Sequence, residues 1–325
     1  METDIRRANQ VARKVIDNIS GVLIGDEPAV RLVVMGLLAS GHVMVEGPPG
    51  VGKTVLAKSL ARSIDARFQR IQCTADLLPS DITGTNVFDQ RDRDFHFRPG
   101  PILSQIVLID EINRASPRTQ SAFLESLDEH QVTVDGVGHP VPEPFVVIAT
   151  RNPGRHAGTF PLPDTELDRF TVTIELHYPH PHDESAIANR QLVIHPLDEI
   201  GPVVSIEDVR QAQNAVRHVF IDPTVVEYVV ALIGAARSHP SVATGPSTRA
   251  TMAAINMARA HAVLADRDFT TPDDVRAVIA PVLAHRVTEE GVSDGLLDIN
   301  EIVSDLIRQV PIERTNQTMP DNTTT

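Results

Sequence analysis

The sequence predicts an α/β fold built on a mostly parallel sheet, followed by a small all-α domain. Between residues 41 and 176, short apolar runs alternate with amphipathic helical stretches, a pattern typical of helices packed around a parallel sheet. A glycine-rich loop joins the first apolar run to the helix that follows it. From residue 184 onward, helical patterns follow one another without a further strand, which indicates a separate helical domain.

Five short segments are the expected strands of the sheet. They are HVMVE, FQRIQC, IVLID, FVVIAT and FTVTIEL, at residues 42–46, 68–73, 106–110, 145–150 and 170–176. Between them we expect helices at 54–64 and 117–130, the second with Ser116 as N-cap and Pro117 as first helical residue. Residues 1–40 are also expected to be helical, with a break at SGVLIGDEP.

Two insertions interrupt this alternation. Residues 76–100 are too long for an ordinary connection, so we expect them to carry a function. Residues 131–143, QVTVDGVGHPVPE, predict a β-hairpin with its turn near 135–138.

The predicted domains are residues 1–178 and 184–310, with a disordered tail at 311–325. The stretch HYPHPHD at 177–183 is predicted to be a linker, because Pro179 and Pro181 disfavour a regular helix. Its three histidines fit no structural zinc spacing. In the second domain, Ser205 and Thr271 open capping-box-like helix starts.

The stretch HVMVEGPPGVGKTVLAK predicts a phosphate-binding loop. Its middle reads G-x-x-x-x-G-K-T between an expected strand and an expected helix, which is the context that this motif requires. Glycines allow positive φ, so that successive backbone N–H groups and the helix N-terminus face a phosphate. Lys53 would reach the β- and γ-phosphates, and the Thr54 hydroxyl would ligate Mg²⁺. The predicted nucleotide-binding residues are Ile24, Gly25, Gly47, Pro48, Pro49, Gly50, Val51, Gly52, Lys53, Thr54, Val55 and Asp110.

Two alternatives were weighed for this loop. A glycine-rich turn without a ligand stays open when the motif is taken alone. A dinucleotide site fits less well, because GVGKTV lacks the third small residue of the G-x-G-x-x-G pattern.

A second motif, IVLIDEINR, strengthens the phosphate-loop interpretation. Its apolar run suits a strand that is buried on both faces and ends in Asp110 and Glu111 at the carboxyl edge of the sheet. Asp110 can hold Mg²⁺ through water, and Glu111 can orient or deprotonate an attacking water. The alternative is a solvated turn after a core strand.

Composition limits the class of function. The 325 residues carry a net charge of −14, which argues against a general nucleic-acid binder, and the absence of Trp argues against base stacking. No apolar run approaches the roughly 18–20 residues of a membrane span, and METDIRRANQ is not a signal segment. Cys73 is the only cysteine, which favours a reducing cytoplasm.

Taken together, the motifs resemble those of the MoxR family of AAA+ ATPases. The likeness extends over roughly residues 20–290 and rests on GHVMVEGPPGVGKT, RIQCTADLLPSDITGT, FHFRPGPI, LIDEINRASPRTQSAFLESLDEHQVT, FVVIATRNPGRHAGTFPLPDTELDRF, GPSTRA and PDDVRAVIAPVLAHRV. The resemblance implies a nucleotide-binding domain, a helical lid and a hexameric ring with ATP sites between subunits. It also matches 76–100 to the helix-2 insert and 131–143 to the hairpin before sensor 1.

Three further roles come only from this resemblance. Asn152 matches the sensor-1 residue that positions water, Arg169 the arginine finger that enters a neighbour's site, and Arg249 the sensor-2 arginine that touches the γ-phosphate. The alternatives are a turn cap for Asn152, a local ion pair with Asp168 or Glu166 for Arg169, and a surface position for Arg249. Arg114 and Arg155 are lesser candidates for contact with a neighbouring nucleotide.

Three functions fit this sequence. The first is a chaperone-like ATPase that remodels or matures a client complex beside a separate protein with a von Willebrand factor A domain, as the resemblance implies. The second is a DNA-directed motor, which the acidic charge disfavours. The third is a scaffold that binds nucleotide without hydrolysis, against which Glu111 and Asn152 argue.

Overall fold

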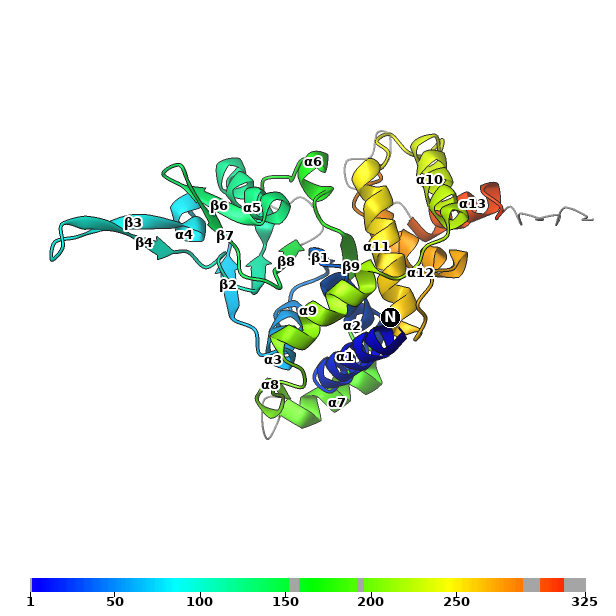
Figure 1. Cartoon of the computed structure of the whole chain (residues 1–325), viewed down its shortest axis with the longest axis horizontal. Helices are drawn as coiled ribbons and strands as arrows, with labels where there is room; N and C mark the ends of the chain where they lie inside the picture. The colour runs from blue at the N-terminus through cyan, green and yellow to red at the C-terminus, as the bar shows by residue number, and fades with distance from the viewer. Residues whose placement is uncertain (1, 152–157, 192–195, 289–298, 313–325) are drawn as a thin grey trace, which may run out of the picture.

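The structure is a computed structural model that describes residues 2–151, 158–191, 196–288 and 299–312 (Figure 1). Its central sheet has five strands in the order β2-β5-β8-β1-β9, and all neighbouring pairs are parallel. The strands are β1 (Val43–Glu46), β2 (Phe68–Gln72), β5 (Ile106–Asp110), β8 (Val146–Arg151) and β9 (Val172–Glu175). The five predicted strands and their parallel arrangement are therefore confirmed. Within the described ranges, no helix is long and apolar enough to cross a membrane.

Helices cover both faces of the sheet, which explains why the central strands β5 and β8 are almost continuously apolar, whereas the edge strand β2 alternates with polar residues. Every residue of β5 is buried. Alternate strand residues enter two different hydrophobic clusters, as the two-residue period of a strand requires. The first cluster includes α1 (Glu2–Ser20), α2 (Glu27–Leu38) and α3 (Lys53–Ser63), and the second includes α5 (Pro117–Glu129).

The two insertions form antiparallel hairpins that lie side by side. Residues 76–100 hold α4 (Pro79–Thr83), β3 (Gly84–Asp89) and β4 (Asp94–Pro99), and Figure 1 shows this hairpin projecting from the body. The predicted second hairpin is confirmed as β6 (Gln131–Val134) and β7 (Val137–Pro140), whose turn residues Asp135 and Gly136 both have positive φ. The Phe97 and His139 rings stack across the hairpins, with their centroids 3.7 Å apart.

The predicted linker is shorter than expected, because α7 (Pro181–Gln191) begins inside it. Pro181 is the first helical residue, a position that proline tolerates since the N–H it lacks would have no intrahelical partner there. After α8 (Pro196–Glu199), α9 (Ile206–Arg217) packs mainly against α1, with further contacts to α2 and to α11 (Thr248–Leu264). One of its contacts is a 2.8 Å hydrogen bond from the Gln213 side chain to the Leu37 carbonyl oxygen.

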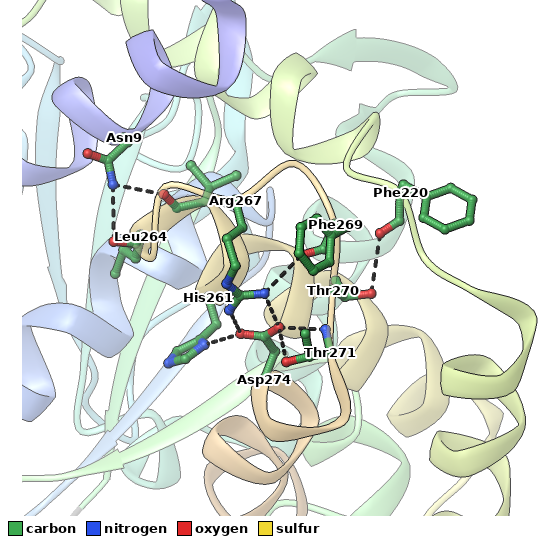
Figure 2. Close-up of polar contacts among 10 residues, drawn as sticks. Asn9, Phe220, His261, Leu264, Arg267, Phe269, Thr270, Thr271 and Asp274 are labelled. Atoms are coloured by element: carbon green, nitrogen blue, oxygen red, sulfur yellow. Dashed lines mark hydrogen bonds and ion pairs between the residues drawn. The ribbon is translucent and has the colours of Figure 1, made fainter. Parts of the chain in front are cut away.

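The remaining helices form the lid. They are α10 (Pro223–Arg237), α11 (Thr248–Leu264), α12 (Pro272–Leu283) and α13 (Ile299–Gln309). Figure 2 shows how the end of α11 and the start of α12 are fixed around the buried Asp274 carboxylate, which accepts hydrogen bonds from His261, Arg267 and Thr271. Those bonds hold the pKa of Asp274 far below its usual range despite its burial. Asn9 of α1 donates to the Val263 and Leu264 carbonyl oxygens, which ties the same end of α11 to the body.

Candidate nucleotide site

The phosphate loop follows β1 at the carboxyl edge of the sheet. Gly47, Gly50 and Gly52 all have positive φ, at 150°, 85° and 99°, a conformation that favours glycine. A Cβ atom on Gly47 would lie 2.4 Å from the Leu176 carbonyl oxygen, whereas a Cβ atom on Gly50 would meet nothing within 4 Å. The inner side of the loop therefore packs tightly against the sheet, and its outer side is open to a ligand.

Lys53 begins α3 and lies under the loop. Its ammonium donates a 2.7 Å hydrogen bond to the Gly47 carbonyl oxygen. Burial lowers the pKa of Lys53, and the charges of Asp110, Glu111 and Glu46 oppose that shift. The lysine and the two carboxylates predicted from separate motifs thus act on one another electrostatically in one site.

Asp110 ends β5 with both carboxylate oxygens engaged. One oxygen accepts a 2.7 Å hydrogen bond from the Thr150 hydroxyl, and the other accepts from Arg70 at 2.6 and 3.1 Å. Neither Thr150 nor Arg70 was identified from the sequence. Their partners lie 40 residues away in the chain, and only the parallel pairing of the strands reveals the contact.

Glu111 adopts the left-handed conformation with φ of 57°, an unusual state for a non-glycine residue that is often found at functional sites. Its backbone N–H donates to the Thr150 hydroxyl at 2.9 Å, so one buried threonine fixes both acidic residues. The Glu111 carboxylate accepts a 2.8 Å hydrogen bond from Arg114. Arg114, a lesser candidate for a neighbour's nucleotide, here pairs with Glu111.

These groups line one pocket of about 370 Å³. Its lining residues are Pro49, Gly50, Gly52, Lys53, Thr54, Val55, Arg70, Gln72, Asp110 and Glu111. The donor set fits a nucleotide triphosphate with Mg²⁺, since it combines a glycine loop at a helix N-terminus, a lysine, a hydroxyl and carboxylates. Ile24 and Gly25 do not line this pocket, although the neighbouring Leu23 comes within 2.9 Å of where a Gly52 Cβ atom would lie. Asn152 and Arg155 lie outside the described residues.

The two predicted arginines lie together on another part of the molecule. Arg169 and Arg249 both form ion pairs with Asp128, near the end of α5, and the Arg249 contact measures 3.1 Å. Arg169 donates its hydrogen bonds to the Asp128 carboxylate and to the Leu124 carbonyl oxygen. These partners differ from Asp168 and Glu166, the local partners given above as the alternative.

Asp128 belongs to the amino edge of the sheet, opposite the phosphate loop. The His42 side chain, just before β1, hydrogen bonds to the Leu127 carbonyl oxygen at 3.2 Å, and the Thr171 N–H donates to the His42 carbonyl oxygen at 2.8 Å. The four residues of β1, roughly 13 Å of extended chain, separate His42 from Gly47. The structure therefore places Arg249 beside Arg169. If Arg249 and Lys53 of one subunit contacted the same γ-phosphate, as expected, Arg249 would have to lie beside Lys53 instead.

The sheet order, the glycine loop and the carboxylates at the end of β5 define a nucleotide-binding domain of the AAA+ class with a helical lid. The profile of the "ATPase family associated with various cellular activities (AAA)" matches residues 42–172, and that of the "AAA lid domain" matches residues 234–306. Related sequences and a solved structure agree with this class.

In sequence, the chain is 35% identical over 315 residues to chaperone MoxR1 of Mycobacterium tuberculosis, covering 94% of this chain and 81% of that protein. It is 32% identical over 338 residues to protein MoxR of Methylorubrum extorquens, covering 95% of each chain. It is also 41% identical over 307 residues to the uncharacterised protein YeaC of Bacillus subtilis, covering 93% of this chain and 95% of YeaC. A crystal structure of a candidate ATPase from Cytophaga hutchinsonii superposes with a TM-score of 0.87 at 32% identity, covering 96% of this chain and 98% of that one. The chain belongs to the MoxR family of AAA+ ATPases.

Proposed function

We propose that this protein hydrolyses ATP with Mg²⁺ at sites shared between neighbouring subunits of a homo-oligomeric ring, which we take to be a hexamer. The observation that carries the proposal is the separation of the two halves of the expected site. The cradle and both acidic residues lie at one edge of the sheet, while Arg169 and Arg249 lie at the other. In a head-to-tail ring, one edge of each subunit would meet the opposite edge of the next.

The surroundings of the arginines support contact with an anion from outside the subunit. Two guanidinium groups share the single carboxylate of Asp128, and half of the Arg249 side chain is exposed, so guanidinium donors remain accessible to an anion. The buried Arg169 Nε–H also has no hydrogen-bond acceptor within the described residues. A γ-phosphate presented by a neighbour would accept hydrogen bonds from the exposed parts of these guanidinium groups.

The cradle side supplies the remaining roles. Lys53 and the loop N–H groups would hold the phosphates, with Mg²⁺ offsetting the phosphate charge beside Thr54 and Asp110. Glu111, fixed by Thr150 and held in a left-handed turn, would orient and deprotonate the attacking water.

The oligomeric part of the proposal is tested by the dependence of turnover on protein concentration. Phosphate release per subunit should rise as the concentration increases and level off when sizing shows rings. The Lys53→Ala variant is the control, since it should release no phosphate at any concentration. Constant specific activity from monomer to ring would contradict a shared site.

We further propose that the ATP energy remodels or matures a client complex together with a separate protein that carries a von Willebrand factor A domain. The relative named chaperone MoxR1 supports a chaperone-like role. An immobilised Glu111→Gln variant in ATP should retain such a partner more strongly than the Lys53→Ala variant, which cannot hold ATP. Equal retention by the two variants would contradict a nucleotide-dependent partnership.

The alternative of a DNA-directed motor is less well supported. The tip of the β3–β4 hairpin, residues 89–94, carries three aspartates and only two arginines, so it lacks the basic character of a phosphate-backbone contact. Stimulation of ATP turnover by DNA, lost at high salt, would favour the motor over the chaperone.

A further inference from the structure

The segment that carries Arg169 is held by the lid of the same subunit. It follows α6 (Asp164–Leu167) and leads into β9, so it belongs to the nucleotide-binding domain by sequence. Yet the side chains that bind it come from the turn that follows α12 and from the N-cap of α11. This grip, which we call the lid latch, consists of Ser247, His285 and Arg286 on the lid side.

Arg286 is the centre of the lid latch. Its side chain is 2% exposed and donates five hydrogen bonds, four of them to the segment from Asp168 to Thr171. Nε reaches the Asp168 carboxylate at 2.7 Å, and the two Nη atoms reach the carbonyl oxygens of Asp168, Phe170 and Thr171 at 3.1, 2.5 and 3.1 Å. Only the planar guanidinium fork offers donors in so many fixed directions.

Two more lid residues complete the grip. Ser247, the N-cap of α11, donates to the second Asp168 oxygen at 2.5 Å, two positions before Arg249. The buried His285 ring bonds to the Phe170 carbonyl oxygen at 3.0 Å and to the Thr173 hydroxyl at 2.8 Å. Since a carbonyl oxygen only accepts, Nε2 carries the proton, and Nδ1 of the neutral ring accepts from Thr173. Burial, the main cause, holds the pKa of His285 well below its usual value, which keeps the ring neutral.

The latch therefore holds the residues on both sides of Arg169 while leaving its side chain free to point elsewhere. Asp168 and Phe170 are bound to the lid, and Arg169 extends from between them to Asp128. An arginine fixed in this way at its backbone loses little further freedom when it meets a ligand, which is how positioning contributes to rate.

We propose that Arg286 and Ser247 are positioning residues for Arg169, so that the lid of each subunit sets the arginine that this subunit presents to its neighbour's nucleotide. The inference rests on the proposed function, because it takes Arg169 to act between subunits. In this arrangement the lid links adjacent sites. If the lid moved when its own subunit bound nucleotide, it would also move the Arg169 that this subunit presents to the neighbouring site.

Mixing variants distinguishes this role from a role in the subunit's own cradle. Arg286→Ala should lower ATP turnover by about 10- to 10²-fold, the cost of misplacing a catalytic group, while leaving ATP binding intact. Mixed with Lys53→Ala, it should regain turnover, because its intact cradle then meets a well-placed Arg169. Mixed with Arg169→Ala, it should regain none, since neither partner offers a well-placed arginine.

The control for the lid is Arg276→Ala, on helix α12, which ends at Leu283, just before Arg286. The Arg276 side chain bonds to Tyr228 and Asp273 and not to the latched segment. It should keep parental turnover. If Arg286→Ala proves unfolded, Ser247→Asp replaces it, since aspartate still caps α11 but repels Asp168 instead of donating to it. Ser247→Asp should show the same mixing pattern with a smaller loss.

Each remaining outcome counts against the proposal. Recovery with Arg169→Ala but not with Lys53→Ala would assign the latch to the subunit's own cradle. Recovery with both, or with neither in folded and assembled rings, would make the latch a structural contact only. Mixtures of Lys53→Ala with Arg169→Ala are measured first, because their failure would overturn the proposed function rather than the latch.

Discussion

The two edges of the central sheet differ in how they are built and in what they offer. At the carboxyl edge, one continuous loop and the end of one strand create an open pocket with backbone donors, Lys53 and two carboxylates. At the amino edge, two arginines from different domains converge on Asp128, and the lid grips the chain beside one of them. Most of the first edge comes from two short continuous stretches of chain, whereas the second is assembled from single side chains of separate elements.

Under the proposed function, the difference teaches that one subunit can carry the residues of a hydrolytic site without containing the complete site. Arg169 and Arg249 lie across the sheet from Lys53, and the packed strands between them cannot be crossed by a side chain. If the two edges are the halves of one site, as we propose, each half gains its counterpart only through a neighbouring subunit.

The largest effect we expect comes from the amino edge. Arg169→Ala should lower ATP turnover by ~10³–10⁵-fold, the range for an arginine supplied in trans, while ATP affinity stays at the parental value because the cradle is untouched. Phosphate release and equilibrium nucleotide binding measure the two quantities. A matching loss of affinity would move Arg169 into the subunit's own cradle and abolish the contrast between the edges.

At the carboxyl edge, Glu111→Gln should keep ATP binding and lower hydrolysis by ~10²–10⁴-fold, since the water-orienting carboxylate is lost. The amide retains the size of the side chain and can still meet Arg114. Single-turnover phosphate release checks the prediction. Hydrolysis at the parental rate would show that another group prepares the water.

Arg249→Ala sharpens the comparison between the two edges. The expected role of Arg249 was in the cradle of its own subunit, whereas the structure places it beside Arg169 at the amino edge. We expect turnover to fall by ~10²–10³-fold, as for the loss of one donor to a charged transition state. Its location beside Arg169 predicts recovery when it is mixed with Lys53→Ala and none when it is mixed with Arg169→Ala. The reverse pattern would return Arg249 to the cradle of its own subunit.

The smallest effect concerns the pH dependence of the amino edge. His42 is fully buried between the Leu127 carbonyl oxygen and the Val147 N–H, and burial, the main cause, lowers its pKa to about 4. Between pH 6.5 and 4 the unfolded chain therefore binds a proton that the folded chain does not, so this residue lowers stability as the pH falls and contributes nothing above pH 6.5. The full difference is about 3 kcal/mol.

The measurement is the free energy of unfolding in denaturant at several pH values. His42→Gln, which cannot titrate, should lack this part of the pH dependence, and its loss of stability between pH 6.5 and 4 should be smaller by up to about 3 kcal/mol. His130 and Asp128, whose charges act on His42, are present in both proteins. Identical pH slopes would mean that His42 takes up its proton without unfolding the edge.

The sequence predicted those features that short stretches of chain determine. The central strands were recognisable because burial on both faces requires continuous apolar runs. The capping boxes at Ser205 and Thr271 were confirmed because a helix start depends on four adjacent residues. The start of α7 was misplaced, since Pro181 both ends an extended segment and opens a helix.

The contacts that escaped prediction join distant segments. Arg70 lies 40 residues from Asp110, Asp128 lies 41 from Arg169, and Arg286 lies 118 from Asp168. AHRV, which contains Arg286, was among the motifs of the family resemblance, but a motif does not reveal its partner. Such pairings depend on the order of the strands in the sheet and on the packing of the lid. The periodicity of apolar residues in the sequence predicts neither.

The central claim, that each subunit's arginine serves its neighbour, is tested most directly by mixing Lys53→Ala with Arg169→Ala. Each variant alone should be inactive. In mixed rings, some sites combine an intact Lys53 with an intact Arg169 from the next subunit, so phosphate release should reappear and peak near an equal mixture. If sizing proves that mixed rings form and no phosphate is released at any ratio, Arg169 does not act between subunits and the account is wrong.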